Sequence, residues 1–427
     1  MDKTVTIIVG AGAVLDFEHK GIFPSVKNIT DEVLKIPVQK VDGSEWLLIK
    51  ELYKHIYDSL KQVGNPETRK LIHPQINFED LLHVLEMCLT YSSCWHDEYL
   101  QWSAFPLFGS LAEPINFLKC IDTIQYRRAA YLLEKRVMEI VNQYDSAFKE
   151  NNSTEGWYRD FWKSLSGKSN ILNLNYDNTI ENSLGEYEDG FLPIEDGEDY
   201  SRFSAKQYYE NRRGVSTIAH LHGQILFSEA RSYPIEYSFR DMVKNKDYQT
   251  ACKNRMATQS TPRTQAKEDY LQPYIISGAR KTEKMVYAPY NVYLSDLSRK
   301  VLENKRLMVI GYSFGDLYLN EILGLGMATH GDDFKVVIID KFSLGIDDYP
   351  YFLQYLKDSC NYGVFEFLLR LVKDRLYVEI GQKEFPLTVK GSDSPFVSRK
   401  GNLMMCIGGF KNAVEKHGEE IRRFLKV

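Results

Sequence analysis

The chain lacks the long apolar run that a membrane span requires. None of its hydrophobic stretches approaches the roughly 20 consecutive apolar residues of a transmembrane helix. Its first residues, MDKTVTIIVGAG, carry a single lysine and no small-residue cleavage site of the kind that ends a signal peptide. The sequence therefore predicts a soluble, cytoplasmic protein.

Paired cysteines are also missing. Six cysteines are scattered singly along 427 residues, and no two of them form a C-x-x-C pair. This pattern excludes the disulfide framework of a small secreted protein. We expect the cysteines to be buried free thiols.

The chain has no excess of positive charge. Its 53 lysines and arginines are outnumbered by 58 aspartates and glutamates, which gives a net charge of −5. This balance argues against a protein whose main task is wrapping nucleic acid. A local basic patch within residues 281–306 is still compatible with this balance.

What the sequence does contain is a series of short apolar runs that end in glycine or polar residues. The first covers residues 4–9 and leads directly into Gly10, Ala11 and Gly12. Four more cover residues 170–176, 216–223, 306–313 and 334–340. Buried parallel strands read as nearly continuous apolar runs separated by helices. The pattern predicts an α/β fold, with a Rossmann-like parallel sheet and helices on both faces.

Helical periodicity fills the region between the first and second runs. Apolar residues recur at helical spacing in residues 44–63, in the segment that follows Asn77, and in roughly residues 115–148. Asn77 has the position of an N-cap, with two acidic residues in the first turn after it. We interpret this region as a helical module inserted into, or laid beside, the sheet domain.

These patterns suggest how the chain is divided. We expect a catalytic domain over residues 1–345, with the helical module at about 44–165 within it, and a small C-terminal subdomain over residues 346–427 for oligomerisation or partner contact. The acidic region 185–214 is interpreted as a loop or lid, and the polar region 244–267 as irregular.

Polar and glycine residues close the predicted strands, where parallel sheets bind their ligands. Gly10 and Gly12 would let a pyrophosphate approach the backbone at a helix N-terminus. Leu15, however, stands where the dinucleotide fingerprint has its third glycine. A tight strand-to-helix turn without a ligand is the alternative.

Residues 306–340 read as one complete βαβ unit with a second glycine turn, GYSFGD. Asp340, at the end of its last strand, is placed to accept hydrogen bonds from a ribose diol. Ser313 and Asp316 could bind a ligand, or they could simply cap the helix that follows.

The two remaining strand ends carry Asn175 and His222. An asparagine can donate and accept hydrogen bonds at once, and a histidine can transfer protons near neutral pH. The alternative for a histidine in an apolar strand is a satisfied position in the core. His220 lies two residues before His222 and would point to the same face, which leaves a metal site sterically open. Because no further ligand follows at a motif spacing, we predict no metal.

In this order, the motifs GAGA, LNYDN, HLHG and GYSFGD resemble the sirtuin-like family, and within it the bacterial antiphage-defence branch of NAD hydrolases more than the protein deacylases. The resemblance covers residues 5–340. It implies that Asn175 and His222 are the catalytic pair, while Asp177 orients them or holds the loop. The cofactor-binding residues that it implies are Gly10, Ala11, Gly12, Gly311, Ser313, Phe314, Asp316 and Asp340.

Two departures from the family pattern matter. Val14 stands where the glycine turn usually continues into serine, so we expect Asp16 to replace that contact with the cofactor. The paired C-x-x-C zinc ribbon of the sirtuin deacylases is absent. Since that ribbon helps to form the acyl-lysine groove, its absence argues against deacylation.

The resemblance implies an NAD glycohydrolase that cleaves NAD to nicotinamide and ADP-ribose and serves antiphage defence by depleting NAD. The alternatives are a sensor that binds NAD or ADP-ribose without turnover, a sirtuin-type protein deacylase, and a nicotinamide oxidoreductase.

Because unrestrained NAD loss would kill the host, the resemblance also implies gating. We expect a homo-oligomer or a separately encoded partner, such as a HerA-type hexameric ATPase. Neither direct membrane contact nor direct nucleic-acid binding is expected.

Overall fold

The computed structural model describes residues 4–17, 24–40, 42–62, 76–93, 123–150, 155–210, 214–229, 242–259, 274–277, 284–341, 387–388, 395–398 and 401–426. Within these residues, no helix is long and apolar enough to cross a membrane. Cys88 and Cys406 are buried free thiols, as expected, and Cys252 is a partly exposed one. The other three cysteines lie outside the described residues.

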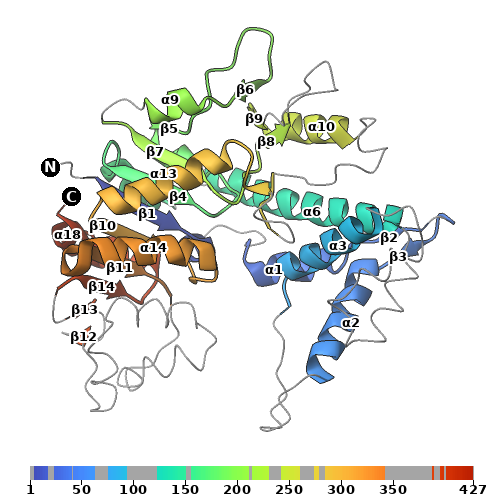
Figure 1. Ribbon diagram of the computed structural model, residues 1–427, viewed down its shortest axis with the longest axis horizontal. Helices are drawn as coiled ribbons and strands as arrows, with labels where there is room; N and C mark the ends of the chain where they lie inside the picture. Colours follow the sequence, from blue (N-terminus) through green and yellow to red (C-terminus); the bar gives the residue numbers. More distant parts are fainter. Residues whose placement is uncertain are drawn as a thin grey trace.

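A nine-stranded sheet stands at the centre of the sequence-predicted catalytic region (Figure 1). Its strand order is β12-β13-β14-β11-β10-β1-β4-β7-β5, and the seven strands from β14 to β5 are parallel. The parallel strands are β1 (Val5–Val9), β4 (Ser169–Asn173), β5 (Tyr187–Glu188), β7 (Ser216–His220), β10 (Arg306–Ile310), β11 (Lys335–Ile339) and β14 (Leu403–Cys406). The antiparallel edge is formed by β12 (Leu387–Thr388) and β13 (Phe396–Ser398). All five predicted runs form strands of this sheet, which confirms the α/β Rossmann-like prediction.

Helices cover both faces of the sheet. Successive residues of a strand point to opposite faces, so Ile8 of β1 packs toward one helical layer and Ile7 toward the other. The first layer contains α13 (Tyr290–Glu303) and α14 (Leu317–His330), and the second contains α7 (Gly156–Ser164) and α18 (Phe410–Leu425). Burial on both faces explains why the strands read as continuous apolar runs.

The order of the strands creates a topological switch point between β1 and β10. The chain leaves β1 toward the face covered by α7 and re-enters the sheet at β4. It leaves β10 toward the opposite face, where α14 lies, and re-enters at β11. The two loops therefore diverge at the carboxyl ends of these strands, which is where open α/β sheets bind ligands.

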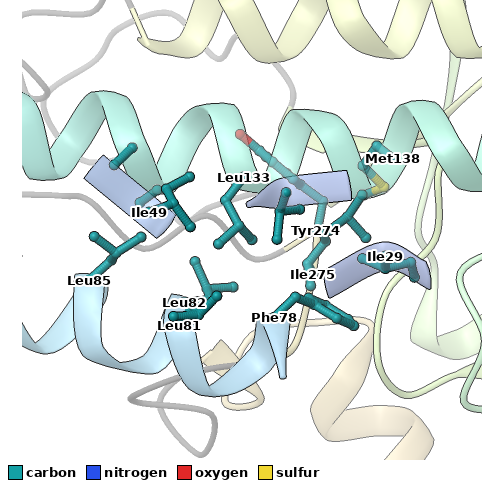
Figure 2. Close-up of a cluster of buried hydrophobic side chains, with 14 of the residues drawn as sticks. Ile29, Ile49, Phe78, Leu81, Leu82, Leu85, Leu133, Met138, Tyr274 and Ile275 are labelled. Atoms are coloured by element: carbon teal, nitrogen blue, oxygen red, sulfur yellow. The ribbon is translucent and has the colours of Figure 1, made fainter. Parts of the chain in front are cut away.

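The helical module packs around a hydrophobic core that also includes Ile225, Phe227 and the segment 274–276. The module consists of α1 (Val26–Val33), α2 (Leu48–Gln62), α3 (Phe78–Ser93) and α6 (Thr123–Glu150). Figure 2 shows Leu81, Leu82 and Leu85 of α3 facing the side chains of α6. The three predicted helices are confirmed. Asn77 also caps α3 as predicted, since its Oδ1 accepts from Glu79 N at 2.7 Å.

Two regions predicted to be irregular contain regular structure. Two helices lie there, α9 (Ala205–Tyr209) and α10 (Tyr248–Gln259). The strands β6 (Tyr200–Arg202) and β9 (Met242–Asn245) also lie there, wholly or in part, and they form a further sheet with β8 (Phe227–Glu229). These elements are short and polar, so periodicity does not reveal them. Tertiary contacts hold them instead: buried Arg255 of α10 donates to the carbonyls of Ile225 and Phe227 at 2.7 and 2.8 Å.

The C-terminal part of the chain adds to the central sheet. β14 pairs in parallel with β11, and α18 packs against both β11 and α7. The boundary proposed at residue 345 stays a prediction, and most of the residues that follow it lie outside the described part of the chain. What the structure shows is that residues 403–425 add a parallel strand to the sheet and a helix to its cover.

A buried ion pair joins the helical module to the segment 274–277. Lys284 is completely buried, and its Nζ pairs with Glu86 of α3 and donates to Ser277 O at 2.8 Å. Glu134 of α6 lies close to this pair, and its burial raises its pKa to about 8 although Lys284 lowers it. The segment 274–277 is thus anchored by buried charged groups in a largely apolar core.

Replacement of Lys284 should lower the free energy of unfolding. Lys284→Met removes the cation facing buried Glu86, and we expect a loss of about 3–5 kcal/mol in the free energy of unfolding, measured by urea denaturation. The double variant Glu86→Leu/Lys284→Met should recover most of that loss, because an apolar pair needs no charge compensation. Equal stability of the wild type and Lys284→Met would contradict this account.

Candidate functional site

One row of paired residues crosses six strands at the carboxyl edge of the sheet. The row consists of Cys406, Ile339, Ile310, Val9, Asn173 and His220, each paired in register with its neighbour. The sequence-predicted residues Gly10, Gly311 and Asp340 follow this row by one position, and Asn175 and His222 follow it by two. Residues 330 positions apart in the sequence are thereby brought to one edge.

The two glycine turns contact each other backbone to backbone. A Cβ on Gly10 would lie 2.5 Å from Gly311 O, and one on Gly12 would lie 2.6 Å from Gly311 Cα. Gly311 has a φ of +59°, and a Cβ there would lie 2.2 Å from Ala13 N. The glycines therefore permit the turns to meet, whereas Ala11 between them is exposed. Close packing of the turns is one reason for these glycines, beside the predicted approach of a pyrophosphate.

Asn175 lies beside the first glycine turn. Its side-chain Nδ2 donates to Gly10 O at 3.2 Å, and its backbone N donates to Asn173 Oδ1 at 3.0 Å. The residue is partly exposed, while Asn173 and Tyr176 are buried. The structure thus brings the amide of β4 to the end of β1, where β1 and β10 diverge.

His222 lies beyond the end of β7 and faces Asp316. Because β7 ends at His220, the two histidines do not share a strand face: His222 Nε2 lies 3.6 Å from Asp316 Oδ2, whereas the His220 ring is buried beside Glu181. The His222 turn is held by the segment 274–277, since Ile276 N donates to His222 O at 2.8 Å.

The loop 311–316 crosses the carboxyl edge to reach His222. β10 and β7 are three strand spacings apart, about 14 Å. Asp316 is the N-cap of α14 and accepts from the backbone N of Tyr318 at 3.0 Å and of Leu319 at 3.3 Å. It therefore caps the helix and faces the histidine at once. In the sheet, β1 and β4 lie between the two strands that precede these partners, β10 and β7.

Comparison with known families agrees with this architecture. Residues 169–354 match the family described as SIR2-like domain, a stretch that begins at β4 and includes Asn175, His222 and the loop 311–316. The match covers less than half of the chain and shows that this region is similar to a SIR2-like domain. Members of this family are NAD-dependent enzymes. No curated protein sequence matches the chain.

The SIR2-like match begins after β1, so it does not include Gly10, Ala11 and Gly12. The sheet supplies that connection, because β1 pairs with both β4 and β10. The N-terminal glycine turn is therefore part of the same structural unit as the SIR2-like domain.

The loop of the second glycine turn exposes Ser313 and buries Phe314. The Phe314 ring packs beside the Tyr312 ring at a centroid distance of 5.0 Å. The backbone φ of Phe314 is +55°, which is rare for a residue with a side chain. Asn320 Nδ2 holds this conformation by donating to Phe314 O at 2.7 Å. A ligand at this loop would meet Ser313 and backbone groups, while the Phe314 side chain belongs to the core.

Two predicted acidic residues lie apart from the His222 contact. Asp177 is buried and accepts from Thr179 N and Oγ1 at 3.0 and 2.5 Å, which fixes the turn after Asn175. Asp16 accepts from Lys341 Nζ at 2.9 Å and from Lys411 N, at the start of α18, at 3.1 Å. These contacts give both residues structural roles. The cofactor contact predicted for Asp16 stays a prediction.

Asp340 ends β11 next to the second glycine turn. Its backbone pairs with the C-terminal segment, through Cys406 O and Gly409 N. Burial raises the pKa of its carboxyl to about 6, although the Lys341 N–H, which donates to Oδ1 at 2.8 Å, lowers it. The carboxylate is partly exposed at the sheet edge. This is the position from which it could accept hydrogen bonds from a ribose.

Sequence reasoning missed Glu181 and Gln224. Glu181 Oε1 accepts from His220 Nε2 at 2.5 Å and from Gln224 Nε2 at 2.7 Å, and all three residues are buried. Glu181 follows Asn175 by six residues in a polar stretch that carries no motif. Only the fold reveals that it lies beneath both candidate loops.

A pocket of about 550 Å³ lies elsewhere, at the β5 edge of the sheet. Its lining includes Tyr187, Asp189, Phe191 and Lys244, and it contains none of the sequence-predicted site residues. In the part of the chain that the structure describes, no three His, Cys, Asp or Glu residues cluster in a way that could hold a metal ion.

The basic stretch 281–306 is largely neutralised where it is described. Arg299 and Lys300 both pair with Asp296, and Lys305 pairs with Asp333. Lys281 lies outside the described residues.

The contact between the glycine turns makes a direct prediction. Gly311→Ala should lower the free energy of unfolding by at least about 3 kcal/mol, because the new Cβ adds backbone strain to steric overlap. Gly315→Ala is the matched control in the same loop, since its Cβ would meet only Ser313 Oγ at 3.5 Å. We expect that variant to stay within about 1 kcal/mol of wild type. Similar losses in both variants, measured by urea denaturation, would count against the contact.

Asp177 should give a pH-dependent term in stability. Burial raises its pKa from 3.8 to about 6, although its hydrogen bonds with Thr179 lower it. Between these two values the folded chain binds the proton more tightly than the unfolded chain, so the stabilising contribution is full at low pH and is lost as pH rises through 6.

Asp177→Asn keeps an oxygen acceptor for Thr179 and removes the charge. We expect it to unfold at higher urea concentration than wild type at pH 8, by up to about 2–3 kcal/mol, and to lose this advantage near pH 4. Asp332→Asn, at an exposed site, controls for net charge. An advantage independent of pH would refute the assignment.

Proposed function

We propose that this chain hydrolyses NAD to nicotinamide and ADP-ribose. The observation that carries the proposal is the pairing of His222 with Asp316 across the strand ends that hold Asn175. The SIR2-like domain supports NAD as the substrate, because members of its family are NAD-dependent enzymes. The diverging loops after β1 and β10 support the position of the site.

The reaction needs little acid catalysis. The bond between ribose C1′ and the nicotinamide nitrogen breaks, and nicotinamide leaves as a neutral molecule because its ring was cationic. A water oxygen bonds to C1′ through an oxocarbenium-like transition state, and the proton that the water loses needs an acceptor. The protein must therefore supply position and a base.

His222 is the base in this proposal. It takes the proton of the water, directly or through a ribose hydroxyl. Asp316, 3.6 Å from Nε2, orients the ring, as a third group orients the base in other nucleophile–base arrangements. This role differs from the cofactor contact that the sequence predicted for Asp316, and the helix-capping alternative is observed beside it.

Asn175 orients the water or the ribose hydroxyls. Its anchoring to Gly10 O keeps the amide at the end of β1, so that its oxygen can accept from a hydroxyl while the Nδ2 donor is partly engaged. In this proposal exposed Ala11 and Ser313 meet the pyrophosphate through backbone and hydroxyl donors. Asp340 accepts from the adenosine ribose.

Two rival functions make different predictions. A sensor would bind NAD or ADP-ribose with no release of nicotinamide. A deacylase would release nicotinamide only when an acyl-lysine peptide is supplied. Assays of nicotinamide release with and without such a peptide separate all three.

We also propose that the activity is gated and serves antiphage defence. This part of the proposal rests on the resemblance of the motifs alone. It assigns control to a homo-oligomer or to a separately encoded protein, such as a HerA-type hexameric ATPase, so the assays are run on the chain alone and with that partner.

His222→Ala should lower kcat for nicotinamide release by about 10²–10⁴-fold, because the general base is removed, while the Kd for NAD changes little. Asp316→Asn should reduce kcat less, since the ring remains. His83→Ala, at an exposed position of α3, controls for loss of a histidine and should match wild type. Undiminished turnover in His222→Ala would refute the assignment of the base.

A further inference from the structure

The His220 ring lies buried between a carboxylate and the backbone of Asn175. Its Nε2 lies 2.5 Å from Glu181 Oε1, and its Nδ1 lies 3.3 Å from Asn175 O. His220 is 1% exposed, so water cannot replace either contact. The histidine that sequence reasoning treated as a neighbour of His222 is thus a direct partner of Asn175.

The contacts of this ring constrain where its protons lie, and they also include Gln224 Nε2 at 3.0 Å from Nε2. A backbone carbonyl can only accept, so Nδ1 must carry a hydrogen that it donates to Asn175 O. Burial pushes the pKa of Glu181 upward, but the charge and hydrogen bond of His220 outweigh it, and the pKa lies below 4.5. A proton also lies between Nε2 and Glu181 Oε1, because two bare acceptors would not approach to 2.5 Å.

Other titratable groups surround Glu181 and set its electrostatic environment. They come from several elements: Asp145 of α6, Tyr158 of α7, Asp177, Tyr187 of β5, Lys244 of β9 and Tyr293 of α13. Of these, Lys244 acts on Glu181 in the same sense as His220, because it lowers the pKa of the carboxyl.

The same carboxylate also contacts the loop of His222. Gln224, two residues after His222, donates from Nε2 to Glu181 Oε1 at 2.7 Å. A backbone hydrogen bond also joins the loop after Asn175 to the loop after His222, since Ile225 N donates to Tyr176 O at 2.9 Å. A shift of Glu181 would therefore move both the loop of Asn175 and the loop of His222.

This arrangement is a costly way to fill a core. Removing two charges from water is expensive, and apolar residues of similar volume often stabilise a core as well or better. Among the described residues, Glu181 Oε2 has no hydrogen-bond partner, which adds a further penalty. Packing alone does not account for a buried His–Glu pair at this position.

We propose that His220 and Glu181 are a positioning pair for the proposed hydrolysis. His220 Nδ1–H fixes the main-chain carbonyl of Asn175, and Glu181 fixes the His220 ring and the start of the loop after His222. The inference rests on the proposed function, in which the Asn175 amide must be held in place. Neither residue touches the substrate.

Two substitutions of His220 separate its contacts. Asparagine places an amide nitrogen near the position of Nδ1, and so can still donate to Asn175 O. Glutamine reaches the position of Nε2, and so can still contact Glu181. We expect His220→Asn to keep kcat for nicotinamide release within about tenfold of wild type, and His220→Gln to lose about 100-fold, with KM for NAD within about twofold in both.

The thermal midpoint of both variants is measured in parallel. A structural role alone would make kcat follow thermal stability. If the two variants have equal kcat, or if the order of their activities follows their stabilities, the inference is overturned.

The ring protons give a readout that does not require turnover. With ¹⁵N-labelled histidine, the His220 signals in the wild type should show a hydrogen on Nδ1, and Glu181→Gln should retain it. An unprotonated Nδ1 in the wild type would overturn the inference. Absence of nicotinamide release by the wild type, with its partner present, would instead overturn the proposed function, so the two failures are distinguishable.

Discussion

The structure depends on the backbone contact between two glycine turns. Gly10 and Gly12 after β1 meet Gly311 after β10 with no side chain between them, and Gly12 N donates to Gly311 O at 2.9 Å. Because β1 and β10 are neighbours whose helices lie on opposite faces, this contact lies at the switch point where open α/β sheets bind their ligands. The position of the loop 311–316, and with it Asp316, follows from that contact.

A second constraint acts on the other side of the site. The loops that carry Asn175 and His222 are held by buried charged groups as well as by apolar packing. His220 and Glu181 lie beneath them, while Lys284 and Glu86 anchor the segment 274–277 that binds His222 O. Buried charges cost free energy, but they fix one geometry and exclude slipped alternatives. The helical module thus contributes to the site through its core, although none of its residues was predicted to act there.

Much of the fold could be predicted from the sequence because its strands are buried on both faces. Five apolar runs became five strands, and parallel pairing then places their carboxyl ends at one edge. The short elements of residues 185–259 escaped prediction, since polar segments such as α10 depend on Arg255 and other tertiary contacts.

The candidate site could be predicted only in part. Motifs located Asn175, His222 and the glycine turns, but not the directions of their side chains. Asp316 was expected at the cofactor and faces His222, and the carboxylate of Asp16 contacts the start of α18. Glu181 had no signal at all, because its partners are 39 and 43 residues away in the sequence. Contacts of this kind exist only once the sheet has formed.

The central claim is that NAD binds at the carboxyl ends of the strands, between the glycine turns and His222. A crystal structure of the His222→Ala variant with NAD would test it most directly. The account predicts the nicotinamide ribose between Asn175 and position 222, with the pyrophosphate at Ala11 and Ser313. NAD bound instead in the pocket lined by Tyr187 and Lys244, with the strand ends vacant, would contradict it.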